Sequence, residues 1–376
     1  MYLKELKLKN FRNYSDLDLT FSPQINVLIG ENAQGKTNLL EAIYVLALAR
    51  SHRMNDDKAL IKWGADFAKV SGVIERKLGS LPLEIILSHQ GKKARINHLD
   101  QDRLSQYVGQ FNVILFAPED LELVKGSPAK RRRFIDMEFG QINHQYLYNI
   151  TQYRNILKQR NLYLRQLKFH EAKDLVYLDV LSDQLAGFGA EIVWARHQFL
   201  QQMAVFAKEQ HQQITQQREQ LQFVYQTVLP DEELTDSDQI YHFLQDQYQK
   251  NRKRELQQGT TVLGPHRDDV AFIVNDRNVQ DFGSQGQQRT VALSLKLAEI
   301  QMVKQQTGEA PVLLLDDVLS ELDDLRQTHL LHTIKNQVQT FLTTTSLDGV
   351  AEEIIGKPTI FQVAAGQVTS ATTESE

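Results

Sequence analysis

The chain has 376 residues and a formal net charge of −5, from 42 basic and 47 acidic side chains. This length is typical of two or three domains, and a composition of 41% hydrophobic and 24% charged residues excludes general disorder and collagen-like repeats. Cysteine is absent, which excludes disulfides, thiolate metal sites and a cysteine nucleophile. Because the net charge is negative, any contact with nucleic acid must come from local basic patches.

The first residues alternate Lys and Leu without an apolar stretch, so no secretory signal is expected. Nowhere does an apolar run reach the roughly 20 residues that a membrane helix needs. We therefore expect a cytoplasmic protein with no membrane partner.

Short strands are predicted over the first 120 residues. Leu6 and Leu8 alternate with lysines, and residues 17–21 alternate in the same way, as in half-buried strands. Residues 27–29 form an apolar run that ends in glycine, typical of a buried strand. Further strand-like runs are 69–74, 83–87, 94–98 and 113–116. Together they predict an antiparallel, β-rich lobe around one buried strand.

Between about residues 143 and 228 the periodicity becomes helical. Proline is absent and large apolar residues recur every three or four positions. The glutamine-rich stretch 201–226 keeps an interrupted apolar stripe, which favours a solvent-rich helix over a disordered tract. The acidic segment 230–238 is expected to end the helical insertion.

After Gly259 the sequence again predicts both strands and helices. A helix is expected at about 286–305 and a frayed tail from 369. Predicted strands are 270–274, 311–315, 341–345 and 359–363. The sequence thus predicts an α/β fold in which residues 1–140 and 251–376 form two parts of one domain, and residues 141–250 form an inserted α-helical domain.

The strongest motif is a complete GxxxxGK[ST] loop between a predicted strand and a predicted helix at 38–49. Glycines let backbone N–H groups close around phosphate oxygens, and the helix dipole favours the negative charge. Lys36 is expected to reach the β- and γ-phosphates of ATP, and Thr37 to ligate Mg²⁺. The alternative is a glycine-rich turn with an incidental lysine. The loop consists of Gly30, Glu31, Asn32, Ala33, Gln34, Gly35, Lys36 and Thr37.

A second motif is the apolar run 312–315, which ends in two acids. A buried parallel strand places such acids at its carboxyl end, where α/β folds bind ligands. Asp316 is expected to hold Mg²⁺, directly or through water, and Asp317 to polarise the attacking water. With Lys36 they form the expected catalytic set. The alternative is a buried strand that merely ends in aspartate.

A third motif, residues 284–289, opens an apolar helix with polar residues and a glycine. Such a helix start can receive an anion. The alternative is that Ser284 only caps the helix.

In this order the three motifs resemble those of ABC-type ATPases. Residues 320–323 resemble the D-loop of that superfamily, and residues 6–12 resemble the first strand of its SMC-like branch. The whole chain resembles the RecF family of bacterial DNA replication and repair proteins. The stretches that carry this closer resemblance are 118–120, 126–128, 131–136 and 264–269.

The resemblance implies an ABC/SMC-like P-loop ATPase head, with the phosphate loop in residues 1–140 and the other two motifs in 251–376. It implies that Ser284, Gly286 and Gln287 contact the γ-phosphate held by a second copy, so that ATP closes a homodimer. It also implies that Arg12 lies near the nucleotide. Asp317 replaces the usual glutamate and is one methylene shorter, so slow, DNA-stimulated hydrolysis is expected.

Two expected ABC elements lack an evident residue. Residues 343–346 occupy the region of the switch histidine, and Asn112 lies near the expected place of the Q-loop glutamine. In the third motif, Gln285 stands where transporters usually have glycine. The two missing roles stay open.

Basic clusters offer candidate DNA contacts, because grouped Lys and Arg neutralise phosphates without reading sequence. For each cluster the alternative is a solvated surface paired with local carboxylates, and for His266 and Arg267 a structural role stays open. The first cluster is Lys125, Lys130, Arg131, Arg132 and Arg133. The others are Lys250, Arg252, Lys253 and Arg254, and Lys92, Lys93 and Arg95.

The family resemblance therefore implies an ATP-dependent DNA-binding clamp in replication, recombinational repair and the SOS response. Such a clamp would bind single- and double-stranded DNA and gap junctions, associate with the nucleoid, and help load recombinase with RecO and RecR. The alternatives are the ATPase subunit of a transport complex and a scaffold whose phosphate loop is vestigial.

Overall fold

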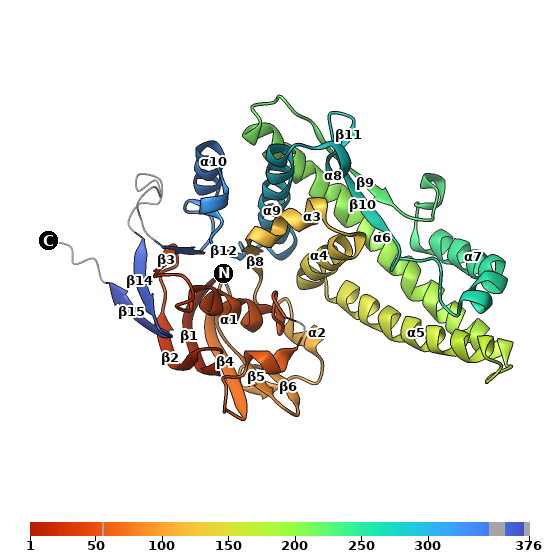
Figure 1. The fold of residues 1–376 in the computed structure, drawn as a ribbon, viewed down its shortest axis with the longest axis horizontal. Coiled ribbons are helices and arrows are strands. Elements are labelled where there is room, and N and C mark those ends of the chain that lie inside the picture. The colour runs from red at the N-terminus through yellow and green to blue at the C-terminus, as the bar shows by residue number, and fades with distance from the viewer. Residues whose placement is uncertain (55, 346–357, 372–376) are drawn as a thin grey trace. The chain divides into compact units, whose positions relative to one another are not determined.

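The computed structural model describes residues 1–54, 56–345 and 358–371 (Figure 1). The chain divides into two compact units. Unit 1 comprises Met1–Asp120, Gln213–Gln217 and Ala292–Glu376, and unit 2 comprises Leu121–Gln212 and Arg218–Val291. Both units combine residues from distant parts of the sequence. The predicted domain boundaries at residues 140 and 250 remain a prediction.

Unit 1 contains an antiparallel sheet in the order β2-β1-β4-β5-β6-β7. Leu6 and Leu8 are buried while the intervening Lys7 is exposed, as the alternation predicts. The strands are β1 (Tyr2–Phe11), β2 (Tyr14–Thr20), β4 (Phe67–Arg76), β5 (Gly79–Ser88), β6 (Gly91–Ile96) and β7 (Leu99–Asp100).

A second sheet of unit 1 has the order β15-β14-β3-β13-β12-β8 and is parallel from β14 to β8. Its strands are β3 (Ile25–Ile29), β8 (Val113–Phe116), β12 (Val312–Leu315), β13 (Thr340–Thr344), β14 (Thr359–Ala364) and β15 (Gln367–Ala371). The prediction of one antiparallel lobe around a buried strand is therefore wrong for β3 and β8. Residues 27–29 of β3 and all of β8 are continuous apolar runs, which suit a sheet covered on both faces.

The predicted fraying from residue 369 is also wrong for residues 369–371, which form part of β15 and pair antiparallel with β14. The rest of that tail, 372–376, lies outside the described residues.

Helix α1 (Lys36–Leu48) contacts both sheets of unit 1, β4 and β5 on one side and β13 and β8 on the other. It is buried nearly all round, as expected for a helix between two apolar layers. Short helices α2 (Leu104–Tyr107) and α10 (Asp324–Ile334) also belong to unit 1. Three-residue and four-residue 3₁₀ turns occur at Asp57–Leu60, Pro118–Asp120 and Leu319–Glu321.

Unit 2 is mainly helical and carries a small antiparallel sheet in the order β11-β10-β9 (Figure 1). Its strands are β9 (Leu221–Gln226), β10 (Asp269–Val274) and β11 (Arg277–Asn278). Its helices are α3 (Leu121–Lys125), α4 (Pro128–Ile142), α5 (His144–Lys168), α6 (Leu175–Ile214), α7 (Ser237–Gln258) and α8 (Val279–Phe282). The long helix α9 (Gln285–Thr307) begins in unit 2 and continues into unit 1.

Two predictions in unit 2 are wrong. The glutamine-rich helix ends at Ile214, and residues 221–226 form β9 because Leu221, Phe223 and Tyr225 alternate with exposed residues and pair with β10. The acidic segment 230–238 does not end the helical region. Instead Asp236 caps α7, its carboxylate accepting a hydrogen bond of 2.9 Å from the Gln239 amide.

Candidate functional site

The phosphate loop lies between the end of β3 and the start of α1, at the carboxyl edge of the parallel sheet. Two of its residues have positive φ, Ala33 (65°) and Gly35 (123°). Gly35 also has no room for a side chain, since a Cβ there would lie 2.7 Å from Asn13 Nδ2. Gly30 is restricted in the same way, because its Cβ would lie 2.2 Å from the Val363 carbonyl oxygen. The glycines of the motif are thus required by the packing around the loop.

Neighbouring turns hold the loop in place. The Tyr14 hydroxyl donates to the Gly35 carbonyl at 3.0 Å, and Asn13 Nδ2 donates to the Gln34 carbonyl at 3.2 Å. From the β14–β15 turn, the Ala365 amide donates to Gln34 Oε1 at 2.7 Å. Sequence reasoning missed these contacts, because no local pattern links Gln34 to a turn 331 positions away.

Lys36 is buried, and its Nζ donates to the carbonyl oxygens of Gly30 at 2.5 Å and Glu31 at 3.2 Å. The ammonium group therefore lies against the first two carbonyl groups of the phosphate loop. This is the position from which a lysine in this motif meets phosphate oxygens.

The Asp316 carboxylate, just beyond β12, lies at the same edge of the sheet. Its Oδ1 accepts hydrogen bonds from the hydroxyls of Thr37 at 3.0 Å and Thr343 at 3.1 Å. Burial raises the pKa of Asp316, while these two hydroxyls act in the opposite direction. The fold thus brings together the two residues that the sequence predicts as magnesium ligands.

Asp317 has a left-handed backbone, with φ of 53°. Its amide donates to Thr343 Oγ1 at 2.8 Å, and its carbonyl accepts from the Ser320 hydroxyl at 2.7 Å. Thr343 therefore contacts both acidic residues of the motif. It can do so because β13 lies between β3 and β12 in the parallel sheet. The order of the motifs marks residues 343–346 only as the region of the switch histidine, and Ser346 lies outside the described residues.

Asn112 lies at the opposite edge of the sheet, because it precedes β8 while Asp316 follows the neighbouring parallel strand. It is therefore not placed to serve as the Q-loop residue. The turn Pro118–Asp120 follows β8, and the Glu119 carboxylate in it contributes to raising the pKa of Asp316.

Arg12 is bound to the helix that follows the loop. Its Nε and Nη2 donate to the two carboxylate oxygens of Glu41 on α1, at 2.8 and 2.9 Å, and Nη1 donates to the Ala59 carbonyl at 3.0 Å. Burial alone would raise the pKa of Glu41, but hydrogen bonds from Arg12 and Ser51 outweigh it and lower that pKa. The geometry gives Arg12 an anchoring contact to α1.

The start of α9, in unit 2, is a reciprocal capping box. Ser284 Oγ accepts from the Gln287 amide at 3.2 Å, and Gln287 Oε1 accepts from the Ser284 amide at 2.9 Å. Ser284 and Gln285 are exposed, and Gly286 is half-buried. Ser284 therefore does cap the helix, and the first turn of α9 is nevertheless exposed to solvent.

Behind this cap, Gln287 Nε2 donates to Glu219 Oε1 at 2.9 Å, and Glu219 Oε2 lies 3.1 Å from Nε2 of the buried His211 on α6. The side chain of Gln287 is thus fixed from two sides. No sequence pattern points to Glu219, because it lies 68 positions before its partner Gln287.

The first basic cluster is largely paired inside unit 2. Arg131 is buried and donates to both carboxylate oxygens of Asp269, at 2.7 and 2.8 Å. Arg132 donates to the Asp268 carbonyl at 2.6 Å, and Lys130 pairs with Glu122 at 2.8 Å. Arg131 therefore has a structural contact and is not available as a DNA contact, because its guanidinium is enclosed.

The other two basic clusters also contain ion pairs. Lys250 pairs with Asp246 and Arg252 with Asp179. Lys92 pairs with Asp57, and Arg95 with Asp100. The alternative of a surface paired with local carboxylates thus applies to parts of every cluster.

A buried ionic network joins the two sequence stretches 131–136 and 264–269. Arg196 on α6 donates to Asp136 at 2.7 Å and to the Pro265 carbonyl at 2.7 Å, and Asp136 also accepts from the Tyr146 hydroxyl at 2.5 Å. Burial alone would lower the pKa of Arg196, and the Asp136 carboxylate reverses this and raises it. These stretches therefore fold into one structural core.

His266 belongs to the same region, its Nδ1 lying 2.7 Å from the Tyr153 hydroxyl. Burial lowers the pKa of His266 to about 4. The Arg267 amide donates to the Gly264 carbonyl at 2.8 Å. Both residues have structural contacts within unit 2.

Comparison with known proteins places the chain in a family. The RecF/RecN/SMC N-terminal domain profile matches residues 2–365. The DNA replication and repair protein RecF of Latilactobacillus sakei subsp. sakei (strain 23K) is 65% identical over 369 residues, which cover 98% of each chain. The chain belongs to the RecF family. RecF of Lacticaseibacillus casei (strain BL23) is 62% identical, over 99% of this chain and 100% of that protein.

Solved structures of RecF share the fold. The recombination mediator protein RecF-ATPrS of the RecFOR pathway has a TM-score of 0.92 and 32% identity, covering 99% of this chain and 98% of its own. A RecF-ATP structure of the same pathway has a TM-score of 0.91 at 33% identity, over 98% and 97% of the two chains. The predicted α/β ATPase-head fold with a helical insert is thus confirmed. An Smc head, at 15% identity and a TM-score of 0.58, shows the fold alone.

Among the described residues, no helix has the length and apolarity to cross a membrane. Within the same residues, no three acidic, histidine or cysteine side chains converge as a metal cage.

Proposed function

We propose that this chain is an ATP-dependent DNA-binding protein of replication and recombinational repair, with ATP as the switch. The observation that carries the proposal is the contact between Thr37 Oγ1 and Asp316 Oδ1, 3.0 Å, beside the Lys36 ammonium. Two residues 279 positions apart meet at the edge of a parallel sheet where such folds bind nucleotides. The similarity to a solved RecF-ATP structure supports the same function.

In this proposal the loop of residues 30–37 surrounds the β- and γ-phosphates through its backbone N–H groups, and Lys36 neutralises their charge. Thr37 and Asp316 supply the hard oxygen ligands that suit Mg²⁺. When bound, the ion neutralises charge on the phosphate oxygens. Asp317 orients the attacking water, and the Thr343 hydroxyl positions both acids. We expect hydrolysis to be slow and stimulated by DNA.

Dimerisation is the second part of the proposal. The exposed first turn of α9, with Ser284, Gly286 and Gln287, would meet the γ-phosphate held by a second copy. Because hydrolysis removes that charge, dimer formation would follow the nucleotide state.

DNA and partner proteins complete the proposal. Lys125, Lys130 and Arg133 are exposed or half-buried, and they remain candidate phosphate contacts. As in the RecFOR pathway named for the neighbouring structures, RecO and RecR are the proposed partners in loading recombinase at gaps. The place of action would be the cytoplasm, on the nucleoid.

Light scattering with and without ATP tests the shared site. We expect wild type to dimerise only with ATP, whereas Lys36→Ala stays monomeric because it cannot hold the triphosphate. Ser284→Arg should bind ATP as a monomer yet fail to dimerise, because the arginine obstructs the helix start. Dimers that form without ATP, or an ATP response that survives Ser284→Arg, would contradict the shared-site arrangement.

A further inference from the structure

The hairpin turn between β14 and β15 lies against the phosphate loop. Strand β14 pairs in parallel with β3, and Gln362 lies opposite Ile29 in the register. Because parallel neighbours run in the same direction, the turn that follows β14 meets the loop that follows β3. The two central residues of the turn, Ala365 and Gly366, have positive φ of 48° and 74°, as in a type I′ hairpin.

Both central N–H groups of this turn donate to one loop residue, Gln34. The Ala365 amide donates to Gln34 Oε1 at 2.7 Å, and the Gly366 amide donates to the Gln34 carbonyl at 3.1 Å. From the turn between β1 and β2, Asn13 Nδ2 donates to the same carbonyl at 3.2 Å. The side chain and the carbonyl of Gln34 are therefore both directed at neighbouring turns.

The direction of the Gln34 carbonyl also sets the direction of the next N–H group. In a planar trans peptide, the C=O of one residue and the N–H of the following residue point in opposite directions, so the Gly35 N–H points away from the hairpin. The Gly35 carbonyl accepts from the Tyr14 hydroxyl and from the Leu39 amide, each at 3.0 Å. By the same rule the Lys36 N–H points out of the start of α1. Successive N–H groups held in this way form the concavity that binds phosphate oxygens.

We propose that the β14–β15 turn sets the phosphate-binding conformation of the loop, and that Gln34 is the positioning residue through which it acts. The inference rests on the proposed ATP site and adds to it a turn 331 positions away in the sequence. The N–H groups of such a loop surround the α- and β-phosphates, so the affinities for ATP and ADP depend on the turn alike. Asp316 is held separately, by the hydroxyls of Thr37 and Thr343. The turn therefore governs nucleotide affinity and not the rate of hydrolysis once ATP is bound.

Two substitutions break this contact from opposite sides. Gln34→Met keeps the length of the side chain and removes the acceptor for the Ala365 amide. Gly366→Ala changes no loop residue but moves the turn, because a Cβ there would lie 2.8 Å from the Asn13 carbonyl oxygen.

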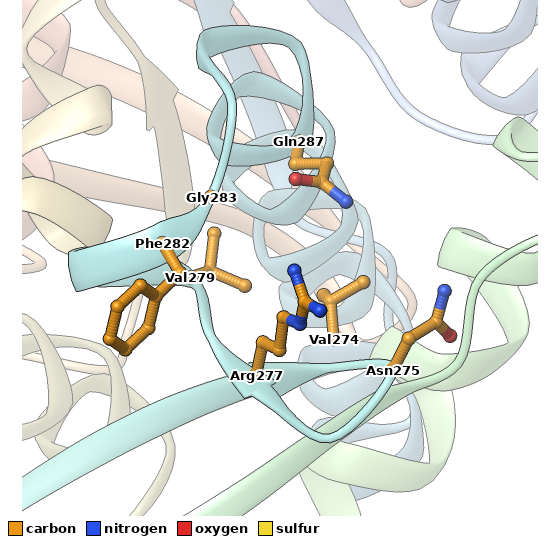
Figure 2. Close-up of a pocket in the computed structure, with 7 residues that line it drawn as sticks. All are labelled: Val274, Asn275, Arg277, Val279, Phe282, Gly283 and Gln287. Atoms are coloured by element: carbon orange, nitrogen blue, oxygen red, sulfur yellow. The ribbon is translucent and has the colours of Figure 1, made fainter.

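Two control substitutions leave the contact intact. Gly308→Ala is matched to Gly366→Ala, because Gly308 has φ of 73° and a Cβ there would meet no atom within 4 Å. Arg277→Lys changes a pocket whose lining residues all belong to unit 2 (Figure 2).

Fluorescent analogues measure the affinities of the full chain for ATP and ADP, and phosphate release at saturating ATP measures hydrolysis. We expect Gln34→Met and Gly366→Ala each to bind both nucleotides about tenfold more weakly, which is the change that one lost hydrogen bond produces. Because both substitutions break one contact, the double variant should also lose about tenfold, whereas independent effects would multiply to about a hundredfold. The rate at saturating ATP should stay as in wild type, and both controls should match wild type in every measurement.

Several outcomes would overturn the role of the turn. If wild type binds ATP and Lys36→Ala does not, yet Gln34→Met and Gly366→Ala bind as wild type does, this inference is wrong and the proposed function stands. Losses that multiply in the double variant, or an equal loss in Gly308→Ala, would show that the substitutions act separately or through backbone strain alone. A lower rate at saturating ATP with unchanged affinity would place the effect in hydrolysis and contradict the proposal. If wild type does not bind ATP, the proposed function fails together with this inference.

Discussion

At the carboxyl edge of the parallel sheet, one threonine hydroxyl links two acidic residues. Thr343 Oγ1 accepts from the Asp317 amide and donates to the Asp316 carboxylate. The backbone of Asp317 is left-handed, a conformation that non-glycine residues keep only when their surroundings hold it. We infer that the hydroxyl orients the Asp316 carboxylate and holds the backbone of Asp317.

Replacing Thr343 with valine keeps the shape of the side chain but removes both hydrogen bonds. Each lost bond to a buried group costs about 1–3 kcal/mol, so the geometry of the acids should loosen. We expect ATP hydrolysis to fall at least about tenfold, with little change in ATP affinity measured without Mg²⁺. Steady-state phosphate release checks this. The control is Thr340→Val in the same strand, whose hydroxyl lies 3.4 Å from the Val338 carbonyl. Equal rates of phosphate release in the two variants would show that the Thr343 hydroxyl has no specific role in hydrolysis.

His266 provides a pH test of the core of unit 2. Its pKa is lowered by burial from 6.5 to about 4, so below pH 6.5 the unfolded chain takes up a proton that the folded chain resists. The contribution of the neutral His266 to the free energy of unfolding is therefore fully present above pH 6.5. It is lost as the pH falls toward about 4, and the loss at pH 5 is about 2 kcal/mol.

We expect His266→Gln to flatten the pH dependence of the free energy of unfolding between pH 7 and pH 5. Urea denaturation at both pH values measures it. The exposed His170→Gln serves as the control and should leave the slope as in wild type. A slope that His266→Gln does not change would show that the proton uptake occurs elsewhere.

At the scale of elements, the start of α9 is held by more than its own cap. The capping box joins Ser284 and Gln287, and Glu219 fixes the Gln287 side chain from the segment before β9. His211 on α6 contacts the other carboxylate oxygen of Glu219. The helix start is thus connected to the longest helix of unit 2 by a chain of hydrogen bonds.

Removing Glu219 by substitution with alanine should free the Gln287 side chain and weaken the cap. A lost cap costs about 1 kcal/mol, which corresponds to roughly fivefold faster hydrogen exchange at the first amides of α9. ATP-dependent dimerisation should weaken by a similar factor. Exchange measured by mass spectrometry checks the first effect, with the exposed Glu232→Ala as the control. Exchange as slow as in wild type would mean that the capping box suffices alone.

At the scale of the whole molecule, each unit has a core of its own, and both cores enclose charged side chains. Unit 1 is built on apolar strands such as β12, whose residues are all buried. Unit 2 contains charges that are almost fully enclosed, with the Arg196 and Asp136 side chains 2% and 7% exposed. Breaking a buried pair leaves an uncompensated charge, which costs about 3–5 kcal/mol.

We therefore expect Asp136→Asn to destabilise unit 2 by about 3–5 kcal/mol and to leave the exchange protection of unit 1 strands close to wild type. Hydrogen exchange of the full chain, measured separately for the amides of each unit, distinguishes a loss of protection in unit 2 from one in unit 1. Asp179→Asn, which alters a surface pair with Arg252, should cost less than about 1 kcal/mol. Equal losses in the two variants would contradict a structural role for the buried network.

The sequence determined the features that depend on neighbouring residues. The phosphate loop, the apolar strand before Asp316 and the helix that begins near Ser284 were all predicted, because glycine geometry and apolar periodicity are local. Tertiary structure decided which strands pair, and it placed β3 and β8 in the parallel sheet beside strands from the far end of the chain. It also decided which charged residues are enclosed, since Arg131 meets Asp269 across 138 positions. Thr343, Asn13 and Glu219 act through such distant contacts, and a linear pattern of residue types carries no record of them.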